Sequence, residues 1–261
     1  MLLTHPRRIV VASLVTLTAL VVTGARDHTP PAAGYGLHSA MSLGTPTDRV
    51  RGRIELLEDA RITPDMRHAI ADAYGGDPCA GNPAALRALC HAPDRAPLRH
   101  AMLRLVDARG RVVATQLAER PLAELSAARL YGSRRRTYLY TVDLGIGAGS
   151  YAGPLTRLLE PDARGFGWLT ADSAGVARGP IALVSTLKSA WRFAPQSHGK
   201  GQDLLMLLCR PDLRVGRDST ARFVLTYKRY TFTGGTWRLR QRQAPGCFES
   251  DQPFPPASDF P

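Results

Sequence analysis

The chain has 261 residues, of which 44% are hydrophobic and 7% aromatic, which is ordinary for a globular protein and excludes a chain too polar to build a core. Its formal net charge is +12 at pH 7, and Lys188, Lys200 and Lys228 are the only lysines, so the basic residues are nearly all arginine. This bias is typical of a GC-rich genome and does not by itself indicate nucleic-acid binding, although the charge also suits an anionic surface.

The first 25 residues predict a secretory signal peptide. Arg7 and Arg8 precede the apolar run Ile9–Val22, and small residues follow at 23–25. Cleavage after these small residues releases a periplasmic or secreted protein. The alternative is an inner-membrane anchor over residues 9–25, but a spanning helix needs about 20 apolar residues and this run is shorter. We therefore favour export with cleavage.

The next stretch predicts a linker followed by a helical region. Residues 26–47 are rich in Pro, Gly, Ser and Thr, which is typical of a linker. Residues 48–132 are expected to form a region of helices with one hairpin. Val50, Ile54 and Leu57 have helical spacing and predict a helix near the start of this region.

Three further helices and the hairpin are predicted before residue 132. Thr63-Pro64 places an N-cap before a proline at the first helical position, and Asn82-Pro83 repeats this pattern for a short helix that ends at Cys90. Another helix is expected over Pro121–Tyr131. The hairpin pairs residues 100–106 with 111–116, since the segment between them has Asp at the first and Gly at the fourth turn position.

Residues 133–261 predict an antiparallel β-rich region with a proline-rich tail. Apolar and polar residues alternate through residues 137–144. Further strands are expected at 154–160, 165–171, 180–194 and 203–209. The tail from Gln252 to Pro261 cannot extend a sheet and should lie across the surface.

The last hairpin gives the clearest signal in the chain. Gly234-Gly235 is typical of a two-residue turn, and that register places Phe232 opposite Trp237. The same register places Tyr230 opposite Leu239. A bulge near Lys228-Arg229 would bring the apolar residues upstream into the same phase. All these elements together predict an α+β fold, with N-terminal helices packed on a mainly antiparallel β-sheet that forms a sandwich or an open barrel.

The four cysteines predict two disulfides in an exported chain. Three pairings are possible, and we favour Cys79–Cys90 with Cys209–Cys247 because each pair lies within one local region. A metal site at Cys90-His91 is not expected, because no C-x-x-C or H-x-x-x-H spacing supports it.

The glycine-rich segment 145–154 is the strongest candidate for a binding loop. It has no Lys after its last Gly, so it does not match a nucleotide-binding loop, and Ala148 and Ala152 stand where a nucleophile elbow needs glycines. The favoured interpretation is a structural connection between two strands. The alternative is a ligand loop, because loops on rigid scaffolds often carry binding. Its candidate ligand-binding residues are Asp143, Ser150, Tyr151 and Arg157.

Two smaller constellations have ordinary explanations that we favour. Glu249 and Asp251 lie two residues apart, and paired carboxylates can perform glycosidase chemistry, but a loop or ion-pair role is the simpler interpretation. The basic residues of the last hairpin predict a stripe on one sheet face, for which ordinary solubility is the alternative. They are Lys228, Arg238, Arg240 and Arg242.

Two segments resemble a group of exported bacterial proteins of no known activity. One is Thr137–Asp143 continuing into Gly149–Pro154, with the pattern VDxGxGxGSYxGP, and the other is the ending Glu249–Pro255, ESDQPFP. The resemblance covers roughly the C-terminal half of the chain. It implies an exported β-rich protein and nothing about chemistry.

The sequence therefore predicts a non-enzymatic cell-envelope protein that binds a protein partner or an anionic envelope component. The alternative is a hydrolase of an envelope polymer, which would place a base, a nucleophile or paired carboxylates around one cleft. No catalytic residue, cofactor, metal or nucleic-acid partner is assigned. Contact with the membrane is expected only through the signal segment, if it is not cleaved.

Overall fold

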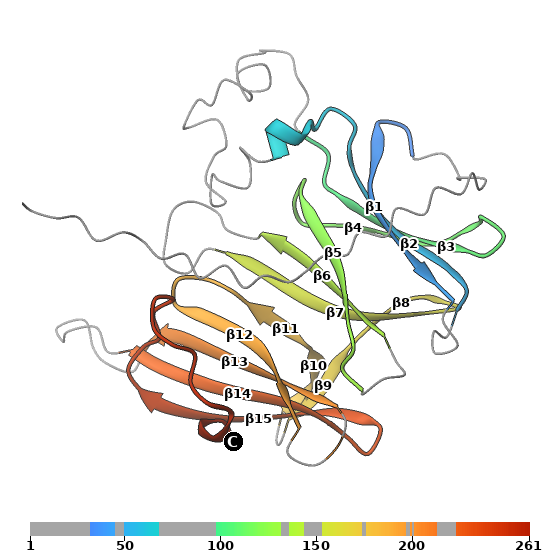
Figure 1. Cartoon of the computed structure of the whole chain (residues 1–261). Helices are drawn as coiled ribbons and strands as arrows, with labels where there is room; N and C mark the ends of the chain where they lie inside the picture. The colour runs from blue at the N-terminus through green and yellow to red at the C-terminus, as the bar shows by residue number, and fades with distance from the viewer. Residues whose placement is uncertain are drawn as a thin grey trace, which may run out of the picture.

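The computed structural model describes residues 32–44, 50–67, 98–131, 136–143, 153–173, 176–196, 199, 201–212 and 223–261. These residues are nearly all β, with 63% in strands and 4% helical. The predicted α+β fold with N-terminal helices packed on a sheet is therefore wrong. The strands form three sheets, which Figure 1 shows as successive layers.

Sheet 1 has four strands in the order β1-β2-β3-β4, and all its pairs are antiparallel. They are β1 (Tyr35–Leu43), β2 (Gly52–Asp59), β3 (Met102–Asp107) and β4 (Val112–Leu117). Sheet 2 has the order β11-β7-β6-β5, with β8 paired to β7. Its strands are β5 (Ala123–Ala128), β6 (Thr137–Asp143), β7 (Pro154–Asp162), β8 (Gly165–Trp168) and β11 (Ala182–Val184).

Sheet 3 has six strands in the order β10-β9-β15-β14-β13-β12, and only its β15–β9 pair is parallel. The strands are β9 (Thr170–Ser173), β10 (Val176–Pro180), β12 (Ser189–Pro195), β13 (Gln202–Pro211), β14 (Phe223–Thr233) and β15 (Thr236–Pro245). The predicted strand at 180–194 is thus divided between three strands, and 165–171 between two.

The helix predicted at Val50, Ile54 and Leu57 is the strand β2. Its spacing misleads because both faces of β2 are buried, so polar and apolar residues do not alternate in the usual way. Ile54 packs in the apolar core, whereas Glu55 is buried against arginines on the other face. Pairing to β1 and β3 decides the conformation over the local helical spacing.

Two more N-terminal predictions are wrong. The helix over Pro121–Tyr131 is the strand β5, which pairs with β6 from Ala123 opposite Val142 to Ala128 opposite Thr137. The stretch 26–47, predicted as a linker, contains β1. In both cases a neighbouring strand supplies backbone hydrogen bonds that local sequence preferences do not reveal.

Other local predictions are confirmed. Residues 64–67 form a helical turn, and the Met66 amide donates a hydrogen bond of 3.2 Å to the hydroxyl of Thr63, as expected of an N-cap. The rest of that helix, and the helix predicted after Asn82-Pro83, lie outside the described residues. The β3–β4 hairpin forms as predicted, with the Gly110 amide donating to the carbonyl of Asp107.

The β14–β15 hairpin has the predicted register, with Phe232 opposite Trp237. Gly234 and Gly235 both have positive φ, 59° and 82°, as a primed turn requires. The bulge predicted near Lys228-Arg229 is wrong, because pairing is continuous along both neighbours of β14. The change of phase has another cause: β14 packs apolar residues on each of its faces, in two different cores.

Three apolar clusters cover the faces of the sheets. The first lies between sheets 1 and 2 and contains Leu56, Leu103 and Tyr138. The second lies between sheets 2 and 3, where Leu158 and Leu183 meet Met206 and Trp237. The third covers the opposite face of sheet 3, which we call the outer face and define by Leu205, Leu207, Leu225 and Tyr227.

The C-terminal tail covers part of the outer face of sheet 3. Phe248 and Phe260 are buried there, and the Phe260 ring packs edge-on against Tyr227. A short 3-10 helix, η2 (Ala257–Asp259), lies just before the end of the chain. The tail therefore lies on the sheet without extending it, as predicted, and it can be followed in dark red in Figure 1.

The predicted disulfide Cys209–Cys247 is present and joins β13 to the start of the tail, with the two Cα atoms 5.1 Å apart. The predicted Cys79–Cys90 pair lies outside the described residues, as do the predicted signal peptide and its cleavage site. Within the described part of the chain, no helix is long and apolar enough to cross a membrane.

Candidate functional site

The binding residues predicted around the glycine-rich loop fall largely outside the described residues. Ser150 and Tyr151 lie outside the described residues, and for Asp143 only the backbone, at the end of β6, is described. Arg157 lies on β7, where its guanidinium forms an ion pair of 2.8 Å with Glu119. A ligand role for this loop therefore stays a prediction.

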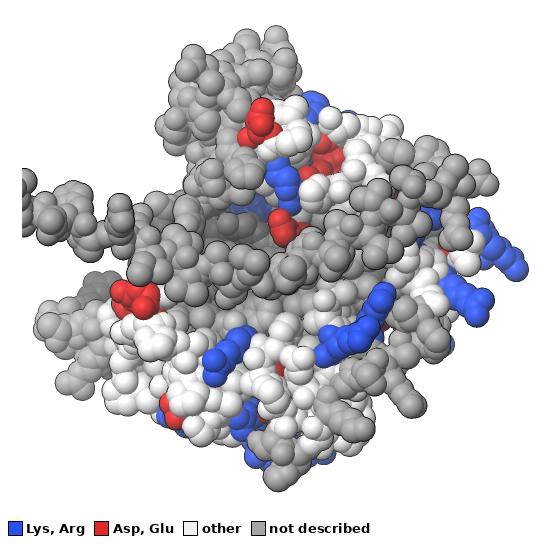
Figure 2. Space-filling model, in the orientation of Figure 1, with Lys and Arg blue, Asp and Glu red and all other residues white. Residues whose placement is uncertain are grey.

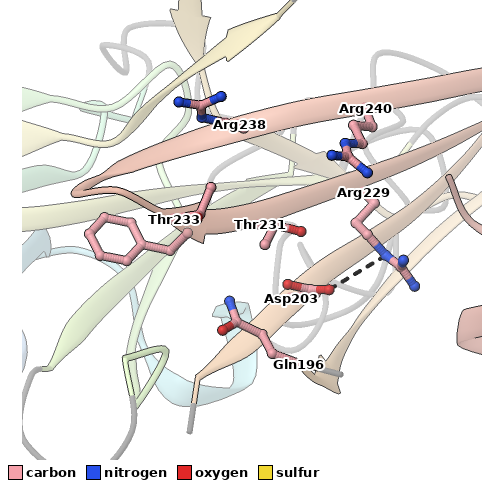
Figure 3. A pocket seen from close by; sticks show the side chains of 8 residues that line it. Gln196, Asp203, Arg229, Thr231, Thr233, Arg238 and Arg240 are labelled. Atoms are coloured by element: carbon pink, nitrogen blue, oxygen red, sulfur yellow. Dashed lines mark ion pairs between the residues drawn. The ribbon is translucent and has the colours of Figure 1, made fainter. Parts of the chain in front are cut away.

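A hollow of about 310 Å³ lies instead on the outer face of sheet 3, beside the tail. Residues of β13, β14 and β15 line it together with the residue that follows β12. They are Gln196, Asp203, Arg229, Thr231, Phe232, Thr233, Arg238 and Arg240. Figure 3 shows Asp203 in the middle of this group.

Strand pairing sets the positions of these side chains. Arg229 on β14 stands opposite Leu205 on β13 and opposite Arg240 on β15, and Thr231 stands opposite Arg238. Since alternate residues of a strand point to the same face, these side chains all belong to the outer face. The turn at Gly234-Gly235 thus places two arginines of β15 beside the polar residues of β14.

Asp203 is the buried centre of the hollow. It is 5% exposed, and its Oδ2 lies 3.5 Å from Nε of Arg229. Arg229 also donates a hydrogen bond from its terminal nitrogen to the carbonyl of Ala257 in the tail. The tail therefore helps to hold the guanidinium beside the hollow.

Three buried polar atoms of the hollow lack hydrogen-bond partners among the described residues. They are Oδ1 of Asp203, Nε2 of Gln196 and Nε of Arg229. A buried polar group without a partner costs free energy, about 1–3 kcal/mol each, and native proteins contain few of them. Three such atoms gathered in one hollow indicate a place where water or a ligand completes the hydrogen bonds.

Burial raises the pKa of Asp203 above the ordinary carboxyl value. The Thr231 hydroxyl, the Arg229 charge and the Gln196 amide oppose this shift. They lie near the carboxyl group, yet none forms a hydrogen bond of normal geometry with Oδ1. The carboxylate is thus surrounded by polar groups and still incompletely satisfied.

The rim of the hollow is basic. Arg238 and Arg240 are exposed, and neither has an ion pair with another described residue. Sheet 3 occupies the lower half of the molecule in the view of Figure 1, and Figure 2 shows basic side chains on that half in the same orientation. Arg229 and Arg240 stand opposite one another, an unfavourable arrangement of like charges. The Asp203 carboxylate lies beside Arg229, whereas Arg240 has no such anion among the described residues.

The basic stripe predicted for the last hairpin is correct only in part. Lys228 stands opposite Met206, on the face of β14 that is turned toward sheet 2, so it does not belong with the three arginines of β15. Burial, with a smaller contribution from Arg210, lowers the pKa of Lys228. Arg242 points to the outer face but binds the tail, since it donates to the Asp259 carbonyl at 2.8 Å.

Of the two carboxylates predicted in the tail, Glu249 has a structural partner. It forms an ion pair with Lys188, in agreement with the simpler interpretation of this residue. Within the described ranges, no group of three or more His, Cys, Asp or Glu side chains is placed to hold a metal ion. The residues lining the hollow include one carboxyl group, that of Asp203.

Comparison with known protein families, characterised proteins and solved structures finds no match to this chain.

Proposed function

We propose that this protein is a binding module of the cell envelope and that the hollow on sheet 3 holds an anionic envelope ligand. The observation that carries the proposal is the group of three arginines around one incompletely satisfied carboxylate. The guanidinium group matches carboxylate and phosphate oxygens with two parallel hydrogen bonds, so it is the side chain best suited to such anions.

The position of the charges supports an anion at the rim. Arg238 and Arg240 are exposed and project from one strand two residues apart, on the same face. An anion that bridges them also relieves the repulsion between Arg240 and Arg229. The predicted signal peptide and the Cys209–Cys247 disulfide support an exported protein, which meets anionic polymers of the envelope.

The test is the affinity of the purified protein for two small polyanions, trigalacturonate and tripolyphosphate, measured by calorimetry at low salt. The double variant Arg238→Gln, Arg240→Gln should weaken binding of at least one of them tenfold or more. Binding should also weaken as salt rises from about 50 to 500 mM, because the rim is exposed.

The matched control removes two exposed arginines elsewhere, Arg109→Gln and Arg164→Gln, which lie in the turns that follow β3 and β7. This variant has the same net charge as the rim variant and should retain the affinity within about twofold, since a distant exposed charge is screened. An equal loss in both variants, or no binding of either polyanion by the unsubstituted protein, contradicts the proposal.

Hydrolysis of an envelope polymer is the second candidate function. It is favoured by the raised pKa of Asp203, which is the property a general acid needs. The described lining supplies no second carboxyl group, whereas glycoside hydrolysis generally uses two. Release of reducing ends from polygalacturonate that disappears in Asp203→Asn would favour this candidate over simple binding.

A further inference from the structure

We infer that the ligand of the hollow is an acidic carbohydrate, which places a hydroxyl group between Asp203, Gln196 and Arg229 and its acidic group at Arg238 and Arg240. This inference rests on the proposed function and names the chemical class of its ligand.

The first step is the set of atoms that need partners. Oδ1 of an ionised Asp203 is an acceptor, whereas Nε2 of Gln196 and Nε of Arg229 are donors. A hydroxyl group donates one hydrogen bond and accepts two. One hydroxyl therefore matches all three atoms in number and kind.

The second step excludes an anion from the same position. An ionised carboxylate or phosphate oxygen has no proton to donate, so it leaves Oδ1 of Asp203 unsatisfied and brings two negative charges together. The buried part of the hollow consequently selects a neutral donor–acceptor group. The anion belongs outside it, where Arg238 and Arg240 are exposed.

The third step concerns the rest of the lining. The hydroxyl groups of Thr231 and Thr233 border the hollow, whereas the ring of Phe232 packs against Tyr131 and Trp237 in the core between sheets 2 and 3. Threonine hydroxyl groups exchange hydrogen bonds with other hydroxyls of a sugar. The volume of about 310 Å³ is at the small end of ligand sites, roughly 300–1,000 Å³, which suits a short acidic glycan segment.

Water competes for the same position, because it also donates and accepts hydrogen bonds. A ligand hydroxyl that reproduces the bonds of an ordered water keeps the affinity, whereas a group that cannot do so loses it. The inference therefore predicts discrimination between two ligands that have equal charge and differ in their hydroxyl groups.

The experiment compares trigalacturonate, which has three carboxylates and many hydroxyls, with tricarballylate, which has three carboxylates, nearly the same net charge above pH 7 and neither hydroxyl nor N–H groups. Calorimetry on the purified protein should show trigalacturonate binding at least tenfold more tightly. Glucose 6-phosphate against methyl phosphate repeats the comparison for a phosphate group.

Two variants locate the discrimination. Asp203→Ala and, as a second variant that alters a less buried residue, Gln196→Ala should each reduce the preference for the hydroxylated ligand to below threefold, with little change for the other ligand. The rim variant Arg238→Gln, Arg240→Gln should weaken both ligands and leave the preference intact. Thermal unfolding checks that each variant is folded.

The outcomes separate the two proposals. If the unsubstituted protein binds the hydroxylated and plain anions within twofold, or if the preference survives in both Asp203→Ala and Gln196→Ala, the hydroxyl inference is wrong while the proposed anion binding stands. If neither kind of anion binds, the proposed function fails as well.

Discussion

Sheets 1 and 3 both bury carboxylates, but they treat them differently. In sheet 1, Glu55 is 1% exposed and its Oε2 accepts a hydrogen bond of 2.6 Å from Arg104. Asp59, also buried, accepts hydrogen bonds from the Arg61 side chain and, at 2.9 Å, from the Arg99 amide. In sheet 3, Asp203 has an arginine 3.5 Å away and one oxygen without a partner.

This difference separates buried carboxylates that stabilise the fold from a buried carboxylate that can still accept a hydrogen bond from a ligand. A buried carboxylate with close arginine and amide donors is a structural element, because removing its partner leaves an unpaired buried charge. A buried carboxylate with an open oxygen in a hollow is instead a place for an outside partner. The same chain contains carboxylates of both kinds. The missing hydrogen-bond partner at Asp203 is therefore not a general property of the buried carboxylates of this protein.

The largest expected effect is in sheet 1. Arg104→Leu should destabilise the protein by about 3–5 kcal/mol, because it leaves Glu55 buried with fewer charge partners. Urea unfolding measures this. The control Arg111→Leu removes an arginine that is 70% exposed and paired with Asp107, and it should cost less than about 1 kcal/mol. Similar losses in the two variants would contradict a structural role for the Glu55–Arg104 pair.

The next largest effect is expected from removing the Cys209–Cys247 disulfide, which joins sheet 3 to the tail. The double variant Cys209→Ala, Cys247→Ala should lose about 2–4 kcal/mol of unfolding free energy, because the disulfide closes a loop with a sequence separation of 38. Chemical denaturation of the oxidised protein, the reduced protein and the variant gives the comparison. A loss below about 1 kcal/mol would mean that apolar packing alone holds the tail on the outer face.

Asp59 should show the pH dependence of a satisfied carboxylate. The Arg61 side chain, together with amide hydrogen bonds and against the effect of burial, holds the pKa of Asp59 well below its usual range. Its ionised form therefore stabilises the fold above about pH 4, the unfolded value, and this stabilisation is lost as the pH falls further. Asp59→Asn should cost about 1–3 kcal/mol at pH 7, and the difference should shrink by about 1 kcal/mol between pH 5 and pH 3.

Asp203 should show the smallest effect and the opposite pH dependence. Because burial raises its pKa, the ionised form costs stability above the folded pKa, and this cost disappears as the pH falls toward the unfolded value of about 4. Asp203→Asn should therefore be as stable as the unsubstituted protein at pH 7, within about 1 kcal/mol, or more stable. The unsubstituted protein should gain relative to the variant on acidification. A large loss at pH 7 would make Asp203 a structural residue like Asp59.

Local chemistry predicts some elements of this protein well. The Gly234-Gly235 turn, with two positive φ angles, is sufficient to set the β14–β15 register, and Asp107 with Gly110 is sufficient for the β3–β4 turn. That register also places Arg229 opposite Arg240 and Thr231 opposite Arg238. Six of the eight residues that line the hollow therefore come from one hairpin, although the bulge predicted in β14 moved these residues out of phase.

The other two lining residues had no local signal. Asp203 and Gln196 come from β13 and from the segment after β12, and only the pairing of those strands with β14 brings them to Arg229. The same holds for β2 and β5, which local spacing predicts as helices and which neighbouring strands make into β structure. The glycine-rich loop gave a strong local pattern, yet the polar residues that converge in the described structure lie elsewhere.

The sequence by itself determined the tight turns, the N-cap at Thr63 and the exclusion of the proline-rich tail from the sheet, and among three possible pairings it favoured the Cys209–Cys247 disulfide. Each depends on a few consecutive residues or on the chemistry of one residue type. Only the tertiary structure decided that both faces of β2 and β14 are buried and that the three sheets form layers. It also decided that Asp203 is buried beside three arginines with one oxygen that lacks a hydrogen-bond partner. These features depend on contacts between strands far apart in the chain, whose burial overrides the local preferences of either strand.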